Sequence, residues 1–286
     1  TLFDLRVPRL LVDMAAGALL ATGGLLLQAV TRNPLAGPEI LGVSQMAALA
    51  VLLALIFFPE LATAWRFPLA WAGAVLALLI VIGLNLRHGL EPLRVTLTGF
   101  AISGVVLAVV SLLVAQFTSN IAQALIWMVG SSYGRTWGDL SAMLPWLLIG
   151  MALCAATTRW MDLLQLGDGV ASSLGLSVVS RRILLIALAS ALIAAAVAVV
   201  GPVAFVGLLV PHGVRLLGFH RARQRLLAAP LLGAALLAAA DLLLVPVPAG
   251  AMAGAMAGGG AGGSGDVGGG GDGGVDIVCH QRDDFH

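Results

Sequence analysis

The sequence predicts an all-α fold, a polytopic bundle of membrane-spanning helices, and two observations carry that prediction. Of the 286 residues, 60% are hydrophobic and only 10% are charged, which lies far outside the range of a soluble globular domain. The apolar residues also come in a series of long runs, and a run of roughly 20 residues is what a helix needs to cross a bilayer. The chain is therefore expected to be an integral, multi-pass membrane protein.

About eight such runs follow one another along the chain. Seven have close to the length of a membrane-spanning helix, and the eighth is shorter. The seven cover residues 9–30, 41–58, 67–86, 95–117, 140–158, 183–200 and 226–245, and the shorter run covers 203–219. A transmembrane domain is therefore predicted over residues 1–245.

The composition excludes several function classes. All 15 basic residues are arginine, so the phosphate-binding lysine of a P-loop is missing and the chain is not itself a P-loop ATPase. The net charge of +1 gives no general attraction to nucleic acid. Cys154 and Cys279 form neither a disulfide framework nor a metal site, so no metal and no cofactor bound by this chain are expected.

The arginines predict the orientation, because cytoplasmic loops keep an excess of positive charge. Alternate loops hold nine arginines, whereas the intervening loops hold only Arg66 and Arg135. This contrast places residues 163–182 in the cytoplasm and the segment before the first helix, with Arg6 and Arg9, outside. An outside start further suggests that another helix precedes this chain. The nine cytoplasmic residues are Arg32, Arg87, Arg94, Arg159, Arg181, Arg182, Arg221, Arg223 and Arg225.

Small residues recur at helical spacing in "GALLATGGLLLQAV", "GFAISGVV" and "ALASALIAAAVAVVG". In lipid such faces allow helices to approach closely, so dense packing within one bundle is expected. Other stretches, "TRNPLAGPEILGVS" and "GPVAFVGLLVPHGVRLLGF", carry helix-breaking prolines. Broken backbone at membrane depth is tolerated only beside protein or water, which predicts a central water-filled pathway. The residues assigned to it are Asn33, Pro34, Gly201, Pro202, Gly207, Pro211 and His212.

Three polar residues fall within the apolar runs, namely Asp13, His212 and Asp241. Intramembrane polar groups are costly, so each needs a reason. Structural roles are favoured, such as capping broken helices or pairing with Arg215, and a proton relay is the alternative. A metal site at His212 is disfavoured because no second ligand lies at suitable spacing nearby.

Four motifs occur in order: "LRVPRLL", "GALLATGGLLLQAVTRNPLAGPEILGVS", "LGDGVASSLGLSV" and "GPVAFVGLLVPHGVRLLGFHRARQRLLAAPLLGAALLAAADLL". Together they resemble the permease family of type II ABC importers, which take up iron-siderophores, haem and cobalamin. The resemblance covers residues 3–243. It implies about ten transmembrane helices, of which the first and the last are expected to be missing here.

The resemblance also implies a role for residues 163–182, where the family forms two short coupling helices that seat in a groove of the ATPase subunit. Leucine and valine side chains offer a small apolar face for docking, and glycines end or bend the short helices. Asp168 and Arg181 are expected to add steering or register. The coupling residues implied are Leu166, Gly167, Asp168, Val170, Ala171, Leu174, Gly175 and Leu176.

Outside the membrane, arginines in the "LRxPR" position of the family pair with glutamates of a binding protein, which implies docking at Arg6 and Arg9. The implied partners are ABC ATPase subunits that bind ATP and Mg²⁺, a periplasmic or lipid-anchored substrate-binding protein, a second permease copy or paralogue, and membrane lipid. The implied location is the bacterial inner membrane and the preferred cargo an iron-siderophore, with haem or cobalamin open. The chain itself is not expected to be an enzyme.

Two rival functions remain open. A secondary transporter would couple uptake of a small solute to an ion gradient through polar groups in the bundle. An intramembrane enzyme would need paired catalytic groups at matching depth, and the two available carboxylates, Asp13 and Asp241, have no catalytic motif around them.

The sequence departs from the family after Asp241. Residues 246–286 form a glycine-rich, low-complexity tail where the family continues with an arginine and a last helix. Such a composition behaves as a flexible linker and cannot bury a core. A shifted reading frame is the expected cause, with a naturally divergent disordered tail as the alternative.

Overall fold

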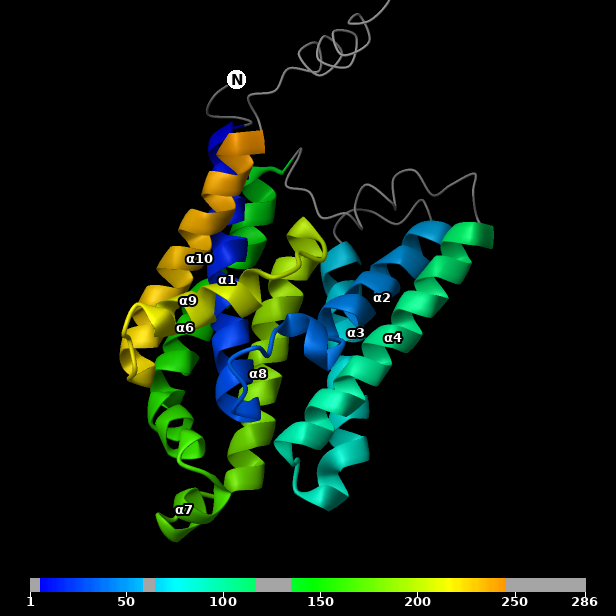
Figure 1. Cartoon of the computed structure of the whole chain (residues 1–286). Helices are drawn as coiled ribbons and strands as arrows, with labels where there is room; N and C mark the ends of the chain where they lie inside the picture. Colours follow the sequence, from blue (N-terminus) through cyan, green and yellow to red (C-terminus); the bar gives the residue numbers. More distant parts are fainter. Residues whose placement is uncertain (1–5, 59–64, 117–134, 245–286) are drawn as a thin grey trace, which may run out of the picture. The chain divides into compact units, whose positions relative to one another are not determined.

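The computed structural model describes residues 6–58, 65–116 and 135–244. Within these residues every regular element is a helix (Figure 1). The predicted tail over 246–286 lies outside the described residues. The helices are α1 (Val7–Thr31), η2 (Pro38–Leu41), α2 (Val43–Phe57), α3 (Arg66–Asn85), η4 (Leu86–His88), α4 (Pro92–Gln116), α6 (Trp137–Gln165), α7 (Asp168–Ser173), α8 (Val178–Val200), α9 (Val206–Leu216) and α10 (Ala222–Leu244).

The predicted multi-pass helical fold is confirmed, with a difference in helix length. In the described part of the chain, six helices are long and apolar enough to cross a membrane: α1, α3, α4, α6, α8 and α10. The runs predicted at 41–58 and 203–219 form α2 and α9, with 15 and 11 residues. Both are shorter than the roughly 20 residues of a straight span. The second is short because α8 ends at Gly201 and the chain stays irregular until Val206.

Helix α1 is the central helix of the bundle. It packs against α10, α8, α6 and α9, and 83% of its most apolar window is buried, compared with 17% for α4. Its glycines make this possible. A Cβ atom on Gly17 would overlap the carbonyl of Gly233 in α10, and one on Gly24 would overlap the carbonyl of Gly207 in α9. The close packing predicted from small residues is confirmed at these crossings.

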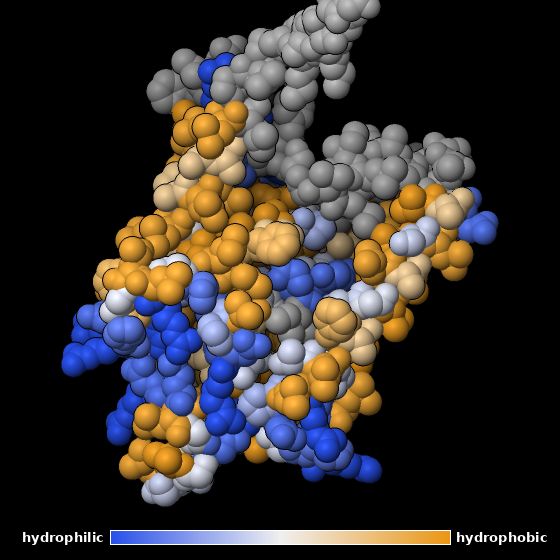
Figure 2. Space-filling view, viewed as in Figure 1, coloured by the Kyte–Doolittle hydropathy of each residue, from blue (hydrophilic) through white to orange (hydrophobic). Residues whose placement is uncertain are grey.

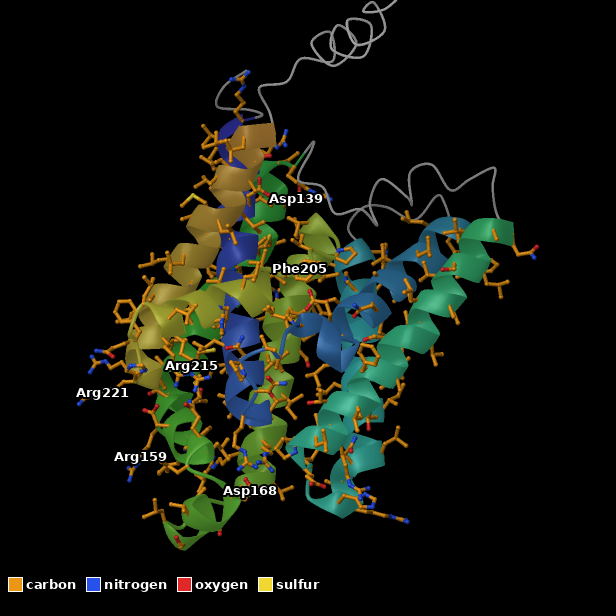
Figure 3. All side chains as sticks on the ribbon, viewed as in Figure 1. Asp139, Arg159, Asp168, Phe205, Arg215 and Arg221 are labelled. Atoms are coloured by element: carbon orange, nitrogen blue, oxygen red, sulfur yellow. The ribbon has the colours of Figure 1, made fainter. Side chains whose placement is uncertain are left out.

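The two ends of the bundle differ in charge. Asp168, Arg159, Arg215 and Arg221 lie toward one end, whereas Asp139 lies toward the other, near the start of α1 (Figure 3). Hydrophilic side chains gather over the first end, while the visible surface of α10 is mostly hydrophobic (Figure 2). This distribution agrees with the orientation predicted from the loop arginines, with α7 on the arginine-rich side and the start of α1 on the opposite side.

Candidate functional site

The connection between α6 and α8 forms one short helix, α7, at the arginine-rich end of the bundle. Gly167 precedes α7 with φ of 102°, and Gly175 follows it with φ of 84°, values that favour glycine over any residue with a Cβ atom. The expectation of two short helices between residues 163 and 182 is therefore wrong in its count. Only Leu176 and Ser177 separate Gly175 from the start of α8, too few for a second helix.

The apolar residues of this connection divide into exposed and buried groups. The side chains of Leu166, Val170 and Leu174 are 59%, 48% and 60% exposed; Val170 lies within α7, whereas Leu166 caps the end of α6 and Leu174 caps the end of α7. Ala171 is fully buried and Leu176 packs against the core. The three exposed side chains form the apolar face of α7, whereas Ala171 and Leu176 hold α7 to the bundle.

Asp168 begins α7 and is paired inside the chain. Its carboxylate accepts two hydrogen bonds from the guanidinium of Arg182, at 3.1 Å and 2.6 Å, and contacts Arg32 at 3.2 Å. Arg181 lies over the ring of Trp160, 4.1 Å from its centroid, which is cation–π geometry. Both charges therefore have partners within the chain, and their expected contribution to steering or register stays a prediction.

Sequence reasoning missed Arg182, which it treated only as a loop charge. In the structure Arg182 is 1% exposed, and it also donates a hydrogen bond to the carbonyl of Leu90 at 3.3 Å. The available signal was its position in the first turns of an apolar helix, because a charge there must either snorkel to water or find a buried partner.

The predicted helix breaks come together at one place in the bundle. The Oδ1 of Asn33 accepts a hydrogen bond from the backbone of Leu35 at 3.0 Å, which turns the chain after α1. In the next turn, Glu39 accepts a hydrogen bond from the backbone N–H of Phe205 at 3.1 Å. The hydroxyl of Ser103 in α4 donates to the Glu39 carbonyl at 2.6 Å. Glu39, which sequence reasoning missed, thus joins the two interrupted segments.

The break between α8 and α9 covers fewer residues than expected. Gly201 ends α8 with φ of 79°, and Phe205 starts α9 with φ of 67°. Pro202 lies between them, but Pro211 lies inside α9, which continues through it. The expectation that Pro211 interrupts the helix is therefore wrong. Gly207 is needed for contact rather than for flexibility, since a Cβ atom there would meet Pro38 and the carbonyl of Leu20.

The polar residues within the spans have identifiable environments. Asp241 forms an ion pair with Arg9, so the suggested pairing with Arg215 is wrong for this carboxylate. Asp13 is buried, and His212 is partly buried. Among the described residues, no group of three His, Cys, Asp or Glu side chains is arranged to hold a metal ion.

The two arginines predicted for docking lie in different environments. Arg6 is exposed at the start of α1, whereas the Arg9 side chain is only 23% exposed and pairs with Asp241 of α10. Arg6 is therefore accessible at the surface, while the charge of Arg9 pairs with Asp241 and links α1 to α10.

Comparisons with known proteins agree with this architecture. The model of the FecCD transport family matches residues 1–257. The Fe(3+) dicitrate permease protein FecD of Escherichia coli is 38% identical over 242 residues, which cover 85% of this chain and 76% of FecD. The Iron(3+)-hydroxamate permease protein FhuB of Salmonella typhimurium is 37% identical over 82% of this chain, but the chain spans only 34% of FhuB.

A solved structure has the same fold. The chain matches the structure of an inward-facing putative metal-chelate type ABC transporter with a TM-score of 0.79 and 29% identity, over 84% of this chain and 77% of that one. The Cobalamin import system permease protein BtuC of Halobacterium salinarum is 38% identical over 83% of this chain and 64% of its own length. From the family model, these relatives and this fold, the chain belongs to the FecCD transport family.

Proposed function

We propose that the chain is the permease subunit of an ATP-driven importer, and that it forms the pathway of an iron chelate across the bacterial inner membrane. The observation that carries the proposal is the apolar face of α7, three exposed side chains at the arginine-rich end of the bundle. A second copy or a paralogous permease completes the pathway. A separate ATPase subunit binds ATP and Mg²⁺, and a substrate-binding protein delivers the chelate from outside.

The apolar face of α7 is suited to a partner protein on the cytoplasmic side. Val170 lies in the short helix α7, with Leu166 and Leu174 on either side of it, and Ala171 and Leu176 hold this connection against the bundle. Exposed apolar side chains carried by a short helix are suited to docking into an apolar groove of a partner. Docking at these side chains gives the ATPase a point of contact through which its conformational change reaches the membrane helices.

The choice of an iron chelate is supported by relatives, since FecD is named for Fe(3+) dicitrate and FhuB for Fe(3+)-hydroxamate. BtuC, named for cobalamin, is about equally similar over its aligned part. Cargo is therefore tested as a panel of radiolabelled ferric citrate, a ferric hydroxamate, haem and cobalamin.

The test is uptake into proteoliposomes that contain the permease, its ATPase subunit and its binding protein. Uptake of one member of the panel is expected to require ATP and to stop with vanadate, because the proposal makes ATP hydrolysis the driving force. Uptake that survives vanadate and follows an imposed proton gradient would instead support a secondary transporter. If cobalamin is the only member of the panel that is taken up, the cargo is cobalamin and not an iron chelate.

Leu174→Asp is expected to weaken binding of the ATPase subunit. A charge placed in an apolar contact removes a central anchor, which commonly costs 2 kcal/mol or more, or about 30-fold in affinity. Leu174→Met is the matched control, because it keeps an apolar side chain of similar volume at the same position. Co-purification of the ATPase subunit measures the effect. Equal recovery with both variants would contradict the docking role of the apolar face.

Arg6→Glu is expected to weaken binding of the substrate-binding protein by about three- to tenfold at low salt, since exposed ion pairs contribute little and are screened by salt. The matched control is Arg94→Glu, which reverses an exposed charge at the opposite end of the bundle. Affinity for reconstituted permease is measured at low and high salt. If the Arg6 and Arg94 variants bind alike at both salt concentrations, Arg6 has no docking role.

A further inference from the structure

The pairing of Asp168 ties α7 to two membrane helices at once. Arg182 reaches the carboxylate from the second turn of α8, and Arg32 reaches it from the end of α1. We refer to these three residues, Arg32, Asp168 and Arg182, as the coupling hub. Since α7 has only six residues, this one carboxylate is its main polar link to the bundle within the described residues.

Burial fixes Arg182, whereas the side chains of Arg32 and Asp168 are 32% and 44% exposed. Arg182 is 1% exposed, and a guanidinium in such a place is tolerated only when it is paired and hydrogen-bonded. Two parallel hydrogen bonds to Asp168 fix the direction of the carboxylate as well as its distance. The third hydrogen bond, to the Leu90 carbonyl, anchors Arg182 to the corner between α3 and α4. The hub therefore contacts the cytoplasmic ends of several helices together.

The backbone around the hub is held in an unusual conformation. In the described ranges three non-glycine residues have positive φ, and two of them, Arg32 at 51° and Leu90 at 56°, belong to the hub or contact it directly. Such residues persist only where the surrounding structure over-determines them, and they cluster at functional sites. Gly167 lies beside Arg32, since a Cβ atom on it would be at van der Waals distance from Nη1 of Arg32, and its φ of 102° favours glycine at this position.

We infer that the coupling hub makes α7 move as one body with the cytoplasmic ends of α1 and α8, so that a displacement of α7 by the ATPase subunit is passed to the central helix of the bundle. The inference rests on the proposed function, because it assumes that the ATPase binds α7. Asp168, Arg182 and Arg32 are positioning residues in this scheme. The apolar face holds the ATPase, and the hub transmits its motion.

The consequence for the bundle follows from the contacts of α1. This helix packs against α10, α8, α6 and α9, and its glycine crossings leave no room for sliding without movement of the partner helices. Its end leads directly into the turn where Glu39 meets Phe205. A shift at Arg32 therefore reaches the interrupted segments assigned to the pathway.

The test measures the distance between α7 and the end of α1 with two spin labels. Cysteines replace Ser172 in α7 and Leu35 after α1, in a background with Cys154→Ala and Cys279→Ser, and the permease is bound to its ATPase subunit. In the parent protein the distance is expected to stay the same between nucleotide-free and vanadate-trapped states. In Asp168→Asn the distribution of distances between the two spin labels is expected to become about twice as wide, because α7 is held less firmly to the end of α1.

Two further variants distinguish the hub from general stability. Arg32→Gln cuts the link to α1 while the doubly hydrogen-bonded pair of Asp168 and Arg182 stays intact, so it gives the same widening even if Asp168→Asn folds poorly. Glu91→Gln is the matched control, since it removes a carboxylate from an exposed pair with Arg94 at the same end of the bundle. ATP hydrolysis by the bound subunit is expected to remain within about twofold of the parent in Glu91→Gln.

The outcomes separate the hub from the proposed function. If Asp168→Asn and Arg32→Gln both give the distance distributions of the parent in both states, the hub does not hold α7 to α1 and the inference is overturned. If the parent permease does not bind the ATPase subunit, the proposed function fails, and the hub fails with it. If the distance distribution widens as much in Glu91→Gln as in Arg32→Gln, the inference about the coupling hub is overturned while the proposed function stands.

Discussion

Gly24→Leu is expected to prevent assembly of the helix bundle. A side chain at this position would begin inside the carbonyl of Gly207, and the obstacle is backbone rather than a movable side chain. Overpacking of an ordinary core costs about 1–3 kcal/mol, and a contact between two backbones should exceed that range because neither helix can relax locally. Since α1 is the central helix, the loss spreads to its contacts with α8 and α10.

The measurement is the yield and thermal unfolding of the detergent-purified permease. Gly104→Leu is the matched control, because nothing lies within 4 Å of a Cβ atom at Gly104 and the helix that carries it, α4, is mostly exposed. We expect the Gly104 variant to elute and melt like the parent, and the Gly24 variant to be lost to aggregation. Equal melting temperatures for the two variants would show that α1 and α9 do not cross as closely as described.

The extent of the membrane helices could be predicted from the sequence because burial in lipid is a property of composition. Apolar runs of sufficient length must be helical, since every backbone polar group in a bilayer must be satisfied within the segment. The predicted run at 140–158 is nevertheless shorter than α6, which begins at Trp137 behind a capping box formed by Thr136 and Asp139. A capping box acts through polar residues, which a hydropathy window treats as the end of a run.

The partners in each ion pair could not be predicted from the sequence, because pairing depends on how the helices cross. Asp168 and Arg182 are separated by 14 residues and Arg9 and Asp241 by 232. Composition identifies each of them as a costly group that needs a partner, but not which partner. The same limit applies to α7, where the coupling residues implied by the resemblance included Ala171, whereas the packing of the helix buries Ala171 and leaves Val170 exposed.

Arg9→Glu is expected to destabilise the bundle rather than only weaken docking. Arg9 and Asp241 are 23% and 11% exposed, so the substitution places two like charges together in a mostly buried contact between α1 and α10. Breaking a buried ion pair costs 3–5 kcal/mol, and a loss of about 3 kcal/mol is expected here because part of Arg9 still reaches solvent. Thermal unfolding of the purified permease measures the loss.

The exchange variant separates the structural role of Arg9 from a role in docking. Arg9→Glu combined with Asp241→Arg restores opposite charges across the same contact, so it should recover most of the stability that Arg9→Glu loses. If Arg9 also pairs with a glutamate of the binding protein, the exchanged permease will be stable and still bind that protein weakly, as Arg6→Glu does. If the exchange restores both stability and binding, docking uses Arg6 alone. If it restores neither, the contact between Arg9 and Asp241 does not hold α1 to α10.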